Sequence, residues 1–311
     1  MDHLRKPLED WIRAGRGPAD VSVEAITPFA GGASNITCLV ELSGANEPAV
    51  VLRLQRTEGI FAPYDVLREG RVLAALTHAP FPVPAVLASE PDSAVLGAPF
   101  LLLEYIESLH MGEPGVEADF REYVGAVVAI HSLDWRRAGL EFLGVPARAA
   151  DGLQAELTSV VDRMARFHCD GDPLLATAAA ALAAAIPEDG DVCLCQGDIN
   201  VFNYLFRGGR LVGVVDWEQA RLSDPRGDVG QIIALSHLKG APFCPPREVG
   251  FVFAYEDNAG RELTGLEWFR AFWLFQLAVI HEGWVAFNDS LPWYGRSECD
   301  ALLERALVEI G

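Results

Sequence analysis

The sequence predicts an α+β fold in two parts, a small antiparallel sheet followed by a mostly helical region. Between residues 21 and 54, apolar and polar residues alternate in three short runs, which is typical of a strand meander. From about Ser108 onwards the pattern is mostly helical, interrupted by a short hairpin around a Gly208-Gly209 turn. We therefore expect residues 1–106 to form the sheet part and residues 107–311 the helical part.

The composition is that of a folded and strongly acidic chain. Lys+Arg 24 against Asp+Glu 44 gives a formal net charge of −20, and 50% of the residues are hydrophobic. So acidic a surface argues against nucleic acid or an anionic membrane as a partner.

The N-terminus lacks an apolar signal core, and the apolar stretch 272–280 is too short to span a bilayer. The six cysteines show no C-x-x-C spacing, so we expect reduced thiols in a cytoplasmic protein.

The most informative stretch is residues 195–218. Asp198 and Asn203 lie five positions apart in a short loop, and a hairpin follows that ends on a second carboxylate, Asp216. A tight hairpin returns the chain close to its start, so these three side chains should converge. Phosphoryl transfer needs such a set, with one carboxylate at the attacking hydroxyl and an amide oxygen and a second carboxylate holding Mg²⁺.

This stretch resembles the aminoglycoside/choline-type phosphotransferases, relatives of the protein kinases. Their signature is H-G-D-x-x-x-x-N, then a hairpin and a [VIL]-D-[WFY]-[ED] element. Here it reads Gln196-Gly197-Asp198 through Asn203, then Val215-Asp216-Trp217-Glu218. The resemblance implies a two-lobed protein-kinase-like fold, ATP or GTP with Mg²⁺ as cofactors, Asp198 as the catalytic base, and Asn203 and Asp216 as metal ligands.

One position departs from the family's signature, because the family's histidine is Gln196 here. Since glutamine also donates and accepts hydrogen bonds, we expect lost rigidity rather than lost chemistry.

The resemblance also implies a nucleotide site in the sheet part. Backbone N–H groups of a glycine-containing turn would approach the phosphates, although a plain hairpin turn explains the same residues: Gly31, Gly32, Ala33, Ser34 and Asn35. Beyond this turn, the carbonyl of Glu104 and the N–H of Ile106 would meet the adenine edge.

Arg53 stands on the third strand, where kinase-like folds carry the lysine that grips the phosphates. The chain has only two lysines, Lys6 and Lys239, and neither lies on such a strand. Glu69 of the next helix would then pair with Arg53. The alternatives are a surface ion pair for Arg53 and a solvated helical position for Glu69. An arginine here resembles the branch related to the phosphotransferase domain of acyl-CoA dehydrogenase fusions.

Several helical residues carry alternative interpretations. We interpret His131, at a helix end similar to the family's L-H-x-x-[DP], as structural. Asp228 either braces the catalytic loop or supplies first-turn charge to a helix capped by Asp224. The run 281–284 either faces the acceptor or packs in the core. We expect residues 151–187 to be helical.

The favoured function is a kinase that phosphorylates a hydroxyl group of a small molecule, such as an aminoglycoside, another antibiotic or a metabolite. One alternative is a nucleotide-binding protein without turnover, motivated by Gln196 and Arg53 together. Another is a kinase for hydroxyacyl-CoA substrates, which the Arg53 branch favours, whereas the charge of −20 favours a neutral or cationic acceptor. We expect a monomer or homodimer.

Overall fold

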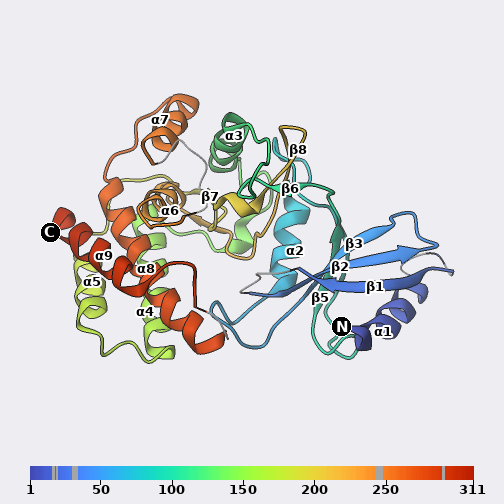
Figure 1. The fold of residues 1–311 in the computed structure, drawn as a ribbon. Helices are drawn as coiled ribbons and strands as arrows, with labels where there is room; N and C mark the ends of the chain where they lie inside the picture. Colours follow the sequence, from blue (N-terminus) through green and yellow to red (C-terminus); the bar gives the residue numbers. More distant parts are fainter. Residues whose placement is uncertain (16–17, 19, 30–33, 242–247, 289–290) are drawn as a thin grey trace. The chain divides into compact units, whose positions relative to one another are not determined.

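The structure, a computed structural model, describes residues 1–15, 18, 20–29, 34–241, 248–288 and 291–311. Its contacts divide the chain into two compact units. The first comprises Met1–His78 and Pro82–Glu107, and the second comprises Ala79–Phe81 and Ser108–Gly311. Figure 1 shows the larger sheet in the first unit and most of the helices in the second. The predicted α+β class, with a small antiparallel sheet and a mostly helical region, is confirmed.

The first unit is built on a five-stranded antiparallel sheet with the order β1-β2-β3-β5-β4. Its strands are β1 (Ser22–Pro28), β2 (Ile36–Ser43), β3 (Ala49–Leu54), β4 (Val86–Glu90) and β5 (Phe100–Glu104). Two helices, α1 (Asp2–Arg13) and α2 (Val66–Ala75), pack against it.

The two helices cover opposite faces of this sheet. The apolar side of α1 joins a core that includes Phe100 and Leu102 of β5. On α2, a Cβ added to Gly70 would lie 2.8 Å from Leu101, so the helix approaches that side chain closely. Since successive strand side chains point to opposite faces, Leu101 belongs to the α2 face. Any residue that pairs with Leu101 across the sheet points towards α2 as well.

The second unit contains seven described α-helices, a three-stranded sheet and a two-stranded sheet. The helices are α3 (Phe120–His131), α4 (Ala149–Arg166), α5 (Pro173–Ala184), α6 (Arg226–Ser236), α7 (Glu248–Ala259), α8 (Leu266–Phe287) and α9 (Arg296–Ile310). The sheets are β6 (Leu109–His110), β8 (Tyr204–Arg207) and β9 (Arg210–Val214), in the order β6-β8-β9, and β7 (Cys193–Cys195) with β10 (Arg221–Ser223).

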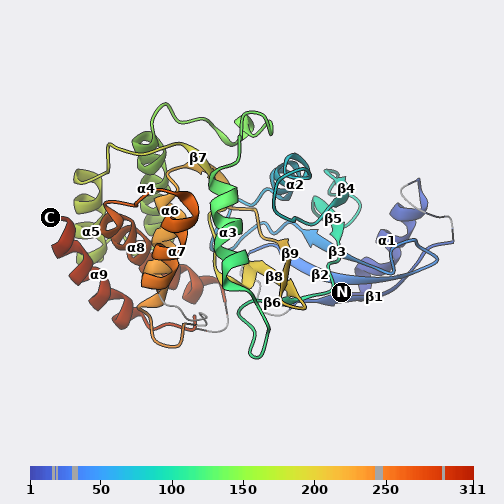
Figure 2. The ribbon, with the colours of Figure 1, turned by 90° about the horizontal axis from the view of Figure 1, so that it is seen from above.

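Helix α8 is the centre of the second unit. It contacts α4, α5, α6 and α9, which surround it in Figure 2. Its sequence is apolar nearly all round, and most of its side chains between Trp268 and Val279 are buried. This is the burial expected of a helix without a polar face. Within the described residues, none of the helices has both the length and the apolarity needed to cross a membrane.

The prediction of helix over residues 151–187 is corrected in one respect. The chain leaves α4 at Phe167, and His168 has a φ of 57°. A new helix begins where the Asp172 carboxylate accepts the N–H of Leu174 at 2.9 Å, with Pro173 in the first turn. An Asp-Pro pair is a standard helix start, so the break could have been predicted from the sequence.

Two smaller differences concern short elements. Helix α6 begins at Arg226 with Pro225 as its N-cap, one residue later than expected. Asp224 still accepts the N–H of Arg226 at 2.9 Å, so its capping role is kept although its position differs. Strands β6 and β10 were not predicted, because runs of two or three residues are too short to show an alternating pattern.

Candidate active site

The catalytic loop leaves β7 through a glycine that no other residue can replace without rearrangement. Gly197 has a φ of 88°, in the left-handed region that favours glycine. A Cβ at this position would clash with the carbonyl oxygen of Gln219 and lie 2.5 Å from the Arg221 guanidinium. The Gly197 N–H points the other way and donates to Asp228 at 3.2 Å. The sharp turn thus aims the following residue, Asp198, out of the strand.

Asp228 holds the start of this loop. It has no solvent exposure, and one carboxylate oxygen accepts the N–H of Gln196 at 2.8 Å. The same oxygen lies 3.2 Å from Nε2 of His131. Burial alone would raise the pKa of Asp228, but the hydrogen bond from His131 and the positive charge of Arg221 outweigh it and lower the pKa. Asp228 therefore both occupies the first turn of α6 and braces the loop.

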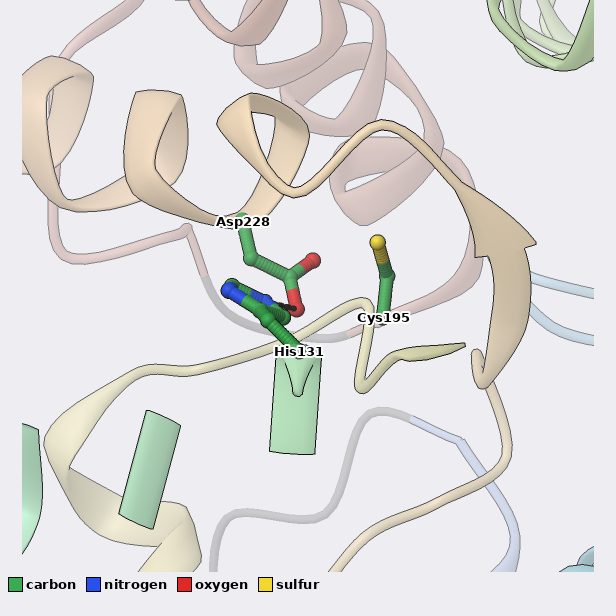
Figure 3. A group of neighbouring side chains, drawn as sticks. All are labelled: His131, Cys195 and Asp228. Carbon is green, nitrogen blue, oxygen red and sulfur yellow. Dashed lines mark hydrogen bonds and ion pairs between the residues drawn. The ribbon is translucent and has the colours of Figure 1, made fainter. Parts of the chain in front are cut away.

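His131, Cys195 and Asp228 place their ligand atoms within 4.8 Å of one another (Figure 3). Figure 3 shows them converging from α3, β7 and α6. Both ring nitrogens of His131 are already engaged, one by Tyr255 Oη at 2.8 Å and one by Asp228. Burial raises the pKa of the Cys195 thiol well above its usual range, and a metal would need the thiolate. We therefore interpret His131 and Asp228 as a hydrogen-bonded brace, which agrees with the structural role predicted for His131.

Gln196, the residue that replaces the family's histidine, is fully buried. Its Nε2 donates to the carbonyl oxygen of Val215 at 2.8 Å, and its Oε1 accepts the hydroxyl of Tyr204 at 2.8 Å. Both ends of the amide are therefore used. The side chain ties the start of the catalytic loop to the residue immediately before Asp216.

Asp198, Asn203 and Asp216 come together as the spacing predicted. The hairpin pairs Tyr204 with Val214, and the carbonyl of Asn203 accepts the N–H of Val215 at 2.9 Å. The side-chain Nδ2 of Asn203 donates to the backbone carbonyl of Asp198 at 2.8 Å. The three residues therefore lie close together, while their catalytic and metal-binding roles stay predictions.

Asp198 is half-buried, and its Oδ1 accepts two hydrogen bonds. The donors are Asn200 Nδ2 at 2.8 Å and Gln231 Nε2 at 2.5 Å. Burial raises the pKa of Asp198, the negative charge of Asp216 raises it further, and the amides of Asn200, Gln231 and Asn203 oppose both effects. A raised pKa makes the carboxylate a stronger base for a hydroxyl proton.

Sequence reasoning missed Asn200 and Gln231. Asn200 lies two positions after Asp198, and asparagine readily bonds to nearby backbone and side chains. The sequence around Gln231 held a weaker indication of its role, because a glutamine stands there in an otherwise apolar helix. It is buried among Val229, Ile232 and Ile233 on a helix with hardly any exposed residue, and buried polar groups are normally hydrogen-bonded.

The backbone at Asp216 is itself unusual, with a φ of 62°. This conformation is uncommon for residues other than glycine. It costs roughly 1–3 kcal/mol and is found preferentially at functional sites. The hairpin therefore holds the Asp216 carboxylate in a specific direction at the cost of local strain.

The donor set of Asn203 and Asp216 suits Mg²⁺. Because Asn203 Nδ2 donates to the Asp198 carbonyl, the network identifies the other amide atom as the oxygen, Oδ1. An amide oxygen and a carboxylate are hard oxygen ligands of the kind that Mg²⁺ prefers. Two side chains from the protein are enough, since Mg²⁺ usually completes its shell with water and phosphate oxygens.

In the first unit, Arg53 and Glu69 form a buried ion pair. Arg53 pairs with Leu101 across the sheet, so it points to the α2 face. Its Nη2 lies 2.9 Å and its Nε 3.1 Å from Glu69 Oε2, and the two residues are 8% and 1% exposed. Nη1 also reaches Thr37 Oγ1 at 3.4 Å. The predicted pairing of these residues is confirmed, and the surface alternatives for both are wrong.

The roles of the other residues assigned to the nucleotide stay predictions. Gly31, Gly32 and Ala33 lie outside the described residues. Ser34 and Asn35 are buried, and Asn35 Oδ1 accepts the N–H of Arg56 at 3.2 Å. Glu104 and Ile106 lie at and just beyond the end of β5. The exposed Glu104 side chain accepts the N–H of Ala85 at 3.1 Å.

Comparison with known proteins identifies the class. The model of the phosphotransferase enzyme family matches residues 25–272. The chain therefore belongs to this family. Acyl-CoA dehydrogenase family member 10 of Mus musculus is 26% identical over 234 residues, which are 71% of this chain and 21% of that protein. The chain thus spans about a fifth of the length of this curated relative.

Solved structures show the same fold. A candidate aminoglycoside phosphotransferase of Ralstonia eutropha superposes with a TM-score of 0.72 at 23% identity, covering 97% of each chain. The choline kinase LicA of Streptococcus pneumoniae superposes with a TM-score of 0.66 at 14% identity, covering 99% of each chain. LicA has also been solved in complex with AMP. The kinase-like fold predicted from the motifs is therefore confirmed.

Proposed function

We propose that this phosphotransferase moves the terminal phosphoryl group of ATP to a hydroxyl group of a small molecule, with Mg²⁺ as cofactor. The observation that carries the proposal is the convergence of Asp198, Asn203 and Asp216 at one loop and hairpin. A nucleotide-binding protein without turnover would have no need to keep this set, nor to strain the backbone at Asp216.

Each residue has a defined task in this proposal. Asp198 orients the acceptor hydroxyl and takes its proton, for which its raised pKa is suitable. Asn203 and Asp216 hold Mg²⁺, which supplies charge neutralisation for the phosphates when bound. Gln196 keeps the segment before Asp216 attached to the loop that carries Asp198.

We assign nucleotide binding to residues of the first unit. Arg53 would contact phosphate oxygens, and its pairing with Glu69 fixes the guanidinium for that purpose. An arginine offers more than one donor to a phosphate, whereas a lysine offers a point charge. The backbone carbonyl of Glu104 and the N–H of Ile106 would meet the base, and GTP is an alternative donor.

Two acceptor classes have observations in their favour. The net charge of −20 favours a neutral or cationic acceptor such as an aminoglycoside. However, part of this charge is compensated locally, since Glu156 pairs with Arg221, and Asp172 and Glu282 pair with Arg296. The similarity to acyl-CoA dehydrogenase family member 10 favours a hydroxyacyl-CoA acceptor.

A panel assay tests the function and separates these classes. Purified protein, Mg²⁺ and ATP are incubated with aminoglycosides, macrolides, choline, sugars and hydroxyacyl-CoA compounds, and ADP release is measured. Acceptor-dependent ADP release supports the proposal, and its absence with tight ATP binding would favour the binding-protein alternative. For a cationic acceptor KM should rise with ionic strength, because salt screens the attraction.

A further inference from the structure

Gln231 reaches the catalytic loop from α6, although neither signature motif contains it. Its side chain is buried, with an exposure of 4%. Its Nε2 donates to Oδ1 of Asp198 at 2.5 Å, and its Oε1 accepts the N–H of Ile199 at 2.7 Å. One amide therefore bonds to two consecutive residues of the loop.

The partners fix which way this amide points. A backbone N–H can only donate, so the Gln231 atom facing Ile199 must be the oxygen. An ionised carboxylate can only accept, so the atom facing Asp198 must be the nitrogen. A flipped amide would place two acceptors together and two donors together. The orientation is thus determined by the network rather than by the similar shapes of the two atoms.

Asn200 completes the arrangement from within the loop. Its Nδ2 donates to the same Oδ1 of Asp198 at 2.8 Å, and its own Oδ1 accepts the N–H of Phe202 at 2.8 Å. Two donors from separate segments therefore converge on one oxygen. The terminal torsion of an aspartate is broad when nothing restrains it, and two donors on one oxygen restrain it.

We propose that Gln231 is a positioning residue for phosphoryl transfer: together with Asn200 it fixes the plane of the Asp198 carboxylate and leaves Oδ2 to receive the acceptor's proton. This inference rests on the proposed function. In the step concerned, the acceptor O–H bond breaks and its proton goes to Oδ2. The acceptor oxygen forms a bond to the γ-phosphorus, and the bond from that phosphorus to the bridging oxygen breaks, so that its electron pair leaves with ADP.

A purely structural role for Gln231 would consist of holding the Ile199 N–H. Two variants distinguish the roles. Gln231→Glu keeps an acceptor for Ile199 but removes the donor to Asp198, and Gln231→Met removes both. The matched control is Gln276→Met, which replaces a buried glutamine of α8 that has no part in the proposed site.

The experiment measures phosphate release from Mg²⁺·ATP with water as the acceptor, and thermal unfolding of each variant. We expect Gln231→Glu and Gln231→Met to lower kcat by about 10²-fold, the effect of misplacing a reacting group by about 1 Å. KM for ATP should stay unchanged, because the base does not contact the nucleotide before the reaction. Gln276→Met should keep the wild-type kcat.

Four outcomes would overturn the inference. A Gln231→Glu variant with wild-type kcat would show that holding Ile199 is the only role. A fall in kcat that Gln276→Met shares, in proportion to lost stability, would show a general packing effect. Wild-type protein that neither hydrolyses ATP nor phosphorylates any panel acceptor would overturn the proposed function and this inference together. Activity lost in Asp198→Asn but kept in both Gln231 variants would overturn this inference alone.

Discussion

The Nε2 atom of Gln196 and the carbonyl oxygen of Val215 form a hydrogen bond of 2.8 Å. This bond joins the two arms of the candidate site, because Gln196 precedes Asp198 and Val215 precedes Asp216. A glutamine at this position therefore links the metal-binding and base-carrying segments, and the departure from the family's histidine does not leave the loop unattached.

Replacing Gln196 tests this link. Gln196→Leu should lower both the unfolding temperature and kcat, because it removes a hydrogen-bond partner of the half-buried Val215 carbonyl and of the buried Tyr204 hydroxyl, and a buried unsatisfied group costs about 1–3 kcal/mol. Gln196→His, which restores the family residue, should retain more of both than the leucine variant. Differential scanning calorimetry and ADP release measure the two effects. A leucine variant as stable and active as wild type would show that the bond is dispensable.

The buried pair of Arg53 and Glu69 gives a second prediction. Arg53→Met should lower the free energy of unfolding by about 3–5 kcal/mol, because it removes the positive charge that faces the buried Glu69 carboxylate. The double variant Arg53→Met/Glu69→Gln should recover part of this loss, since the buried negative charge is then gone as well. Nucleotide binding should be weak in both. Recovery of ATP affinity in the double variant would remove Arg53 from the phosphate site.

Asp216 should determine how nucleotide binding responds to Mg²⁺. Asp216→Asn is the suitable change, because asparagine tolerates the left-handed backbone better than alanine does. We expect the variant to lose most of the Mg²⁺-dependent gain in ATP affinity and to keep the metal-free affinity. Calorimetric titrations with and without Mg²⁺ measure this. A gain from Mg²⁺ equal to that of wild type would exclude Asp216 as a ligand.

The lowered pKa of the Asp228 carboxyl predicts that the stability of the protein depends on pH. This pKa is lowered in the folded state, and the unfolded value is about 3.9. A depressed pKa stabilises the fold above the unfolded value, and this contribution is lost as pH falls through the folded pKa. The unfolding temperature of wild type should therefore fall more steeply on acidification below about pH 4 than that of Asp228→Asn. At pH 7 the variant should be the less stable protein.

The exposed Asp162 provides the control for this experiment. Asp162→Asn should follow the wild-type curve at every pH. Parallel acid curves for wild type and Asp228→Asn would mean that Asp228 does not carry the acid sensitivity.

The sequence was sufficient for those parts of the site that depend on local spacing. The hairpin after Asn203 and its glycine turn specify a reversal that must bring Asp216 back to Asp198. The pairing of Arg53 with Glu69 was predicted from the resemblance to kinase-like folds, and the structure confirms it. In both cases the relevant distance is set by one or two adjacent elements.

The contacts that cross many elements could not be predicted. Gln231 bonds to Asp198 over a separation of 33 residues, and its role depends on how α6 packs beside the loop. The partners of Gln196 were equally hidden, since an amide shows only that it can donate and accept. The break between α4 and α5 is different, because its Asp172-Pro173 signal was present and alanine-rich sequence on its C-terminal side concealed it.

The central claim, that Asp198 is the base of a phosphoryl transfer, is tested most directly by turnover in Asp198→Asn. The amide keeps an oxygen for the donors at Oδ1, and because burial raises the pKa of Asp198, removing the charge should leave the protein at least as stable as wild type at pH 7. We predict wild-type ATP affinity and a kcat lowered by about 10²–10⁴-fold, with Asp162→Asn unaffected. Near-wild-type turnover in the Asp198→Asn variant with any accepted substrate would contradict the claim.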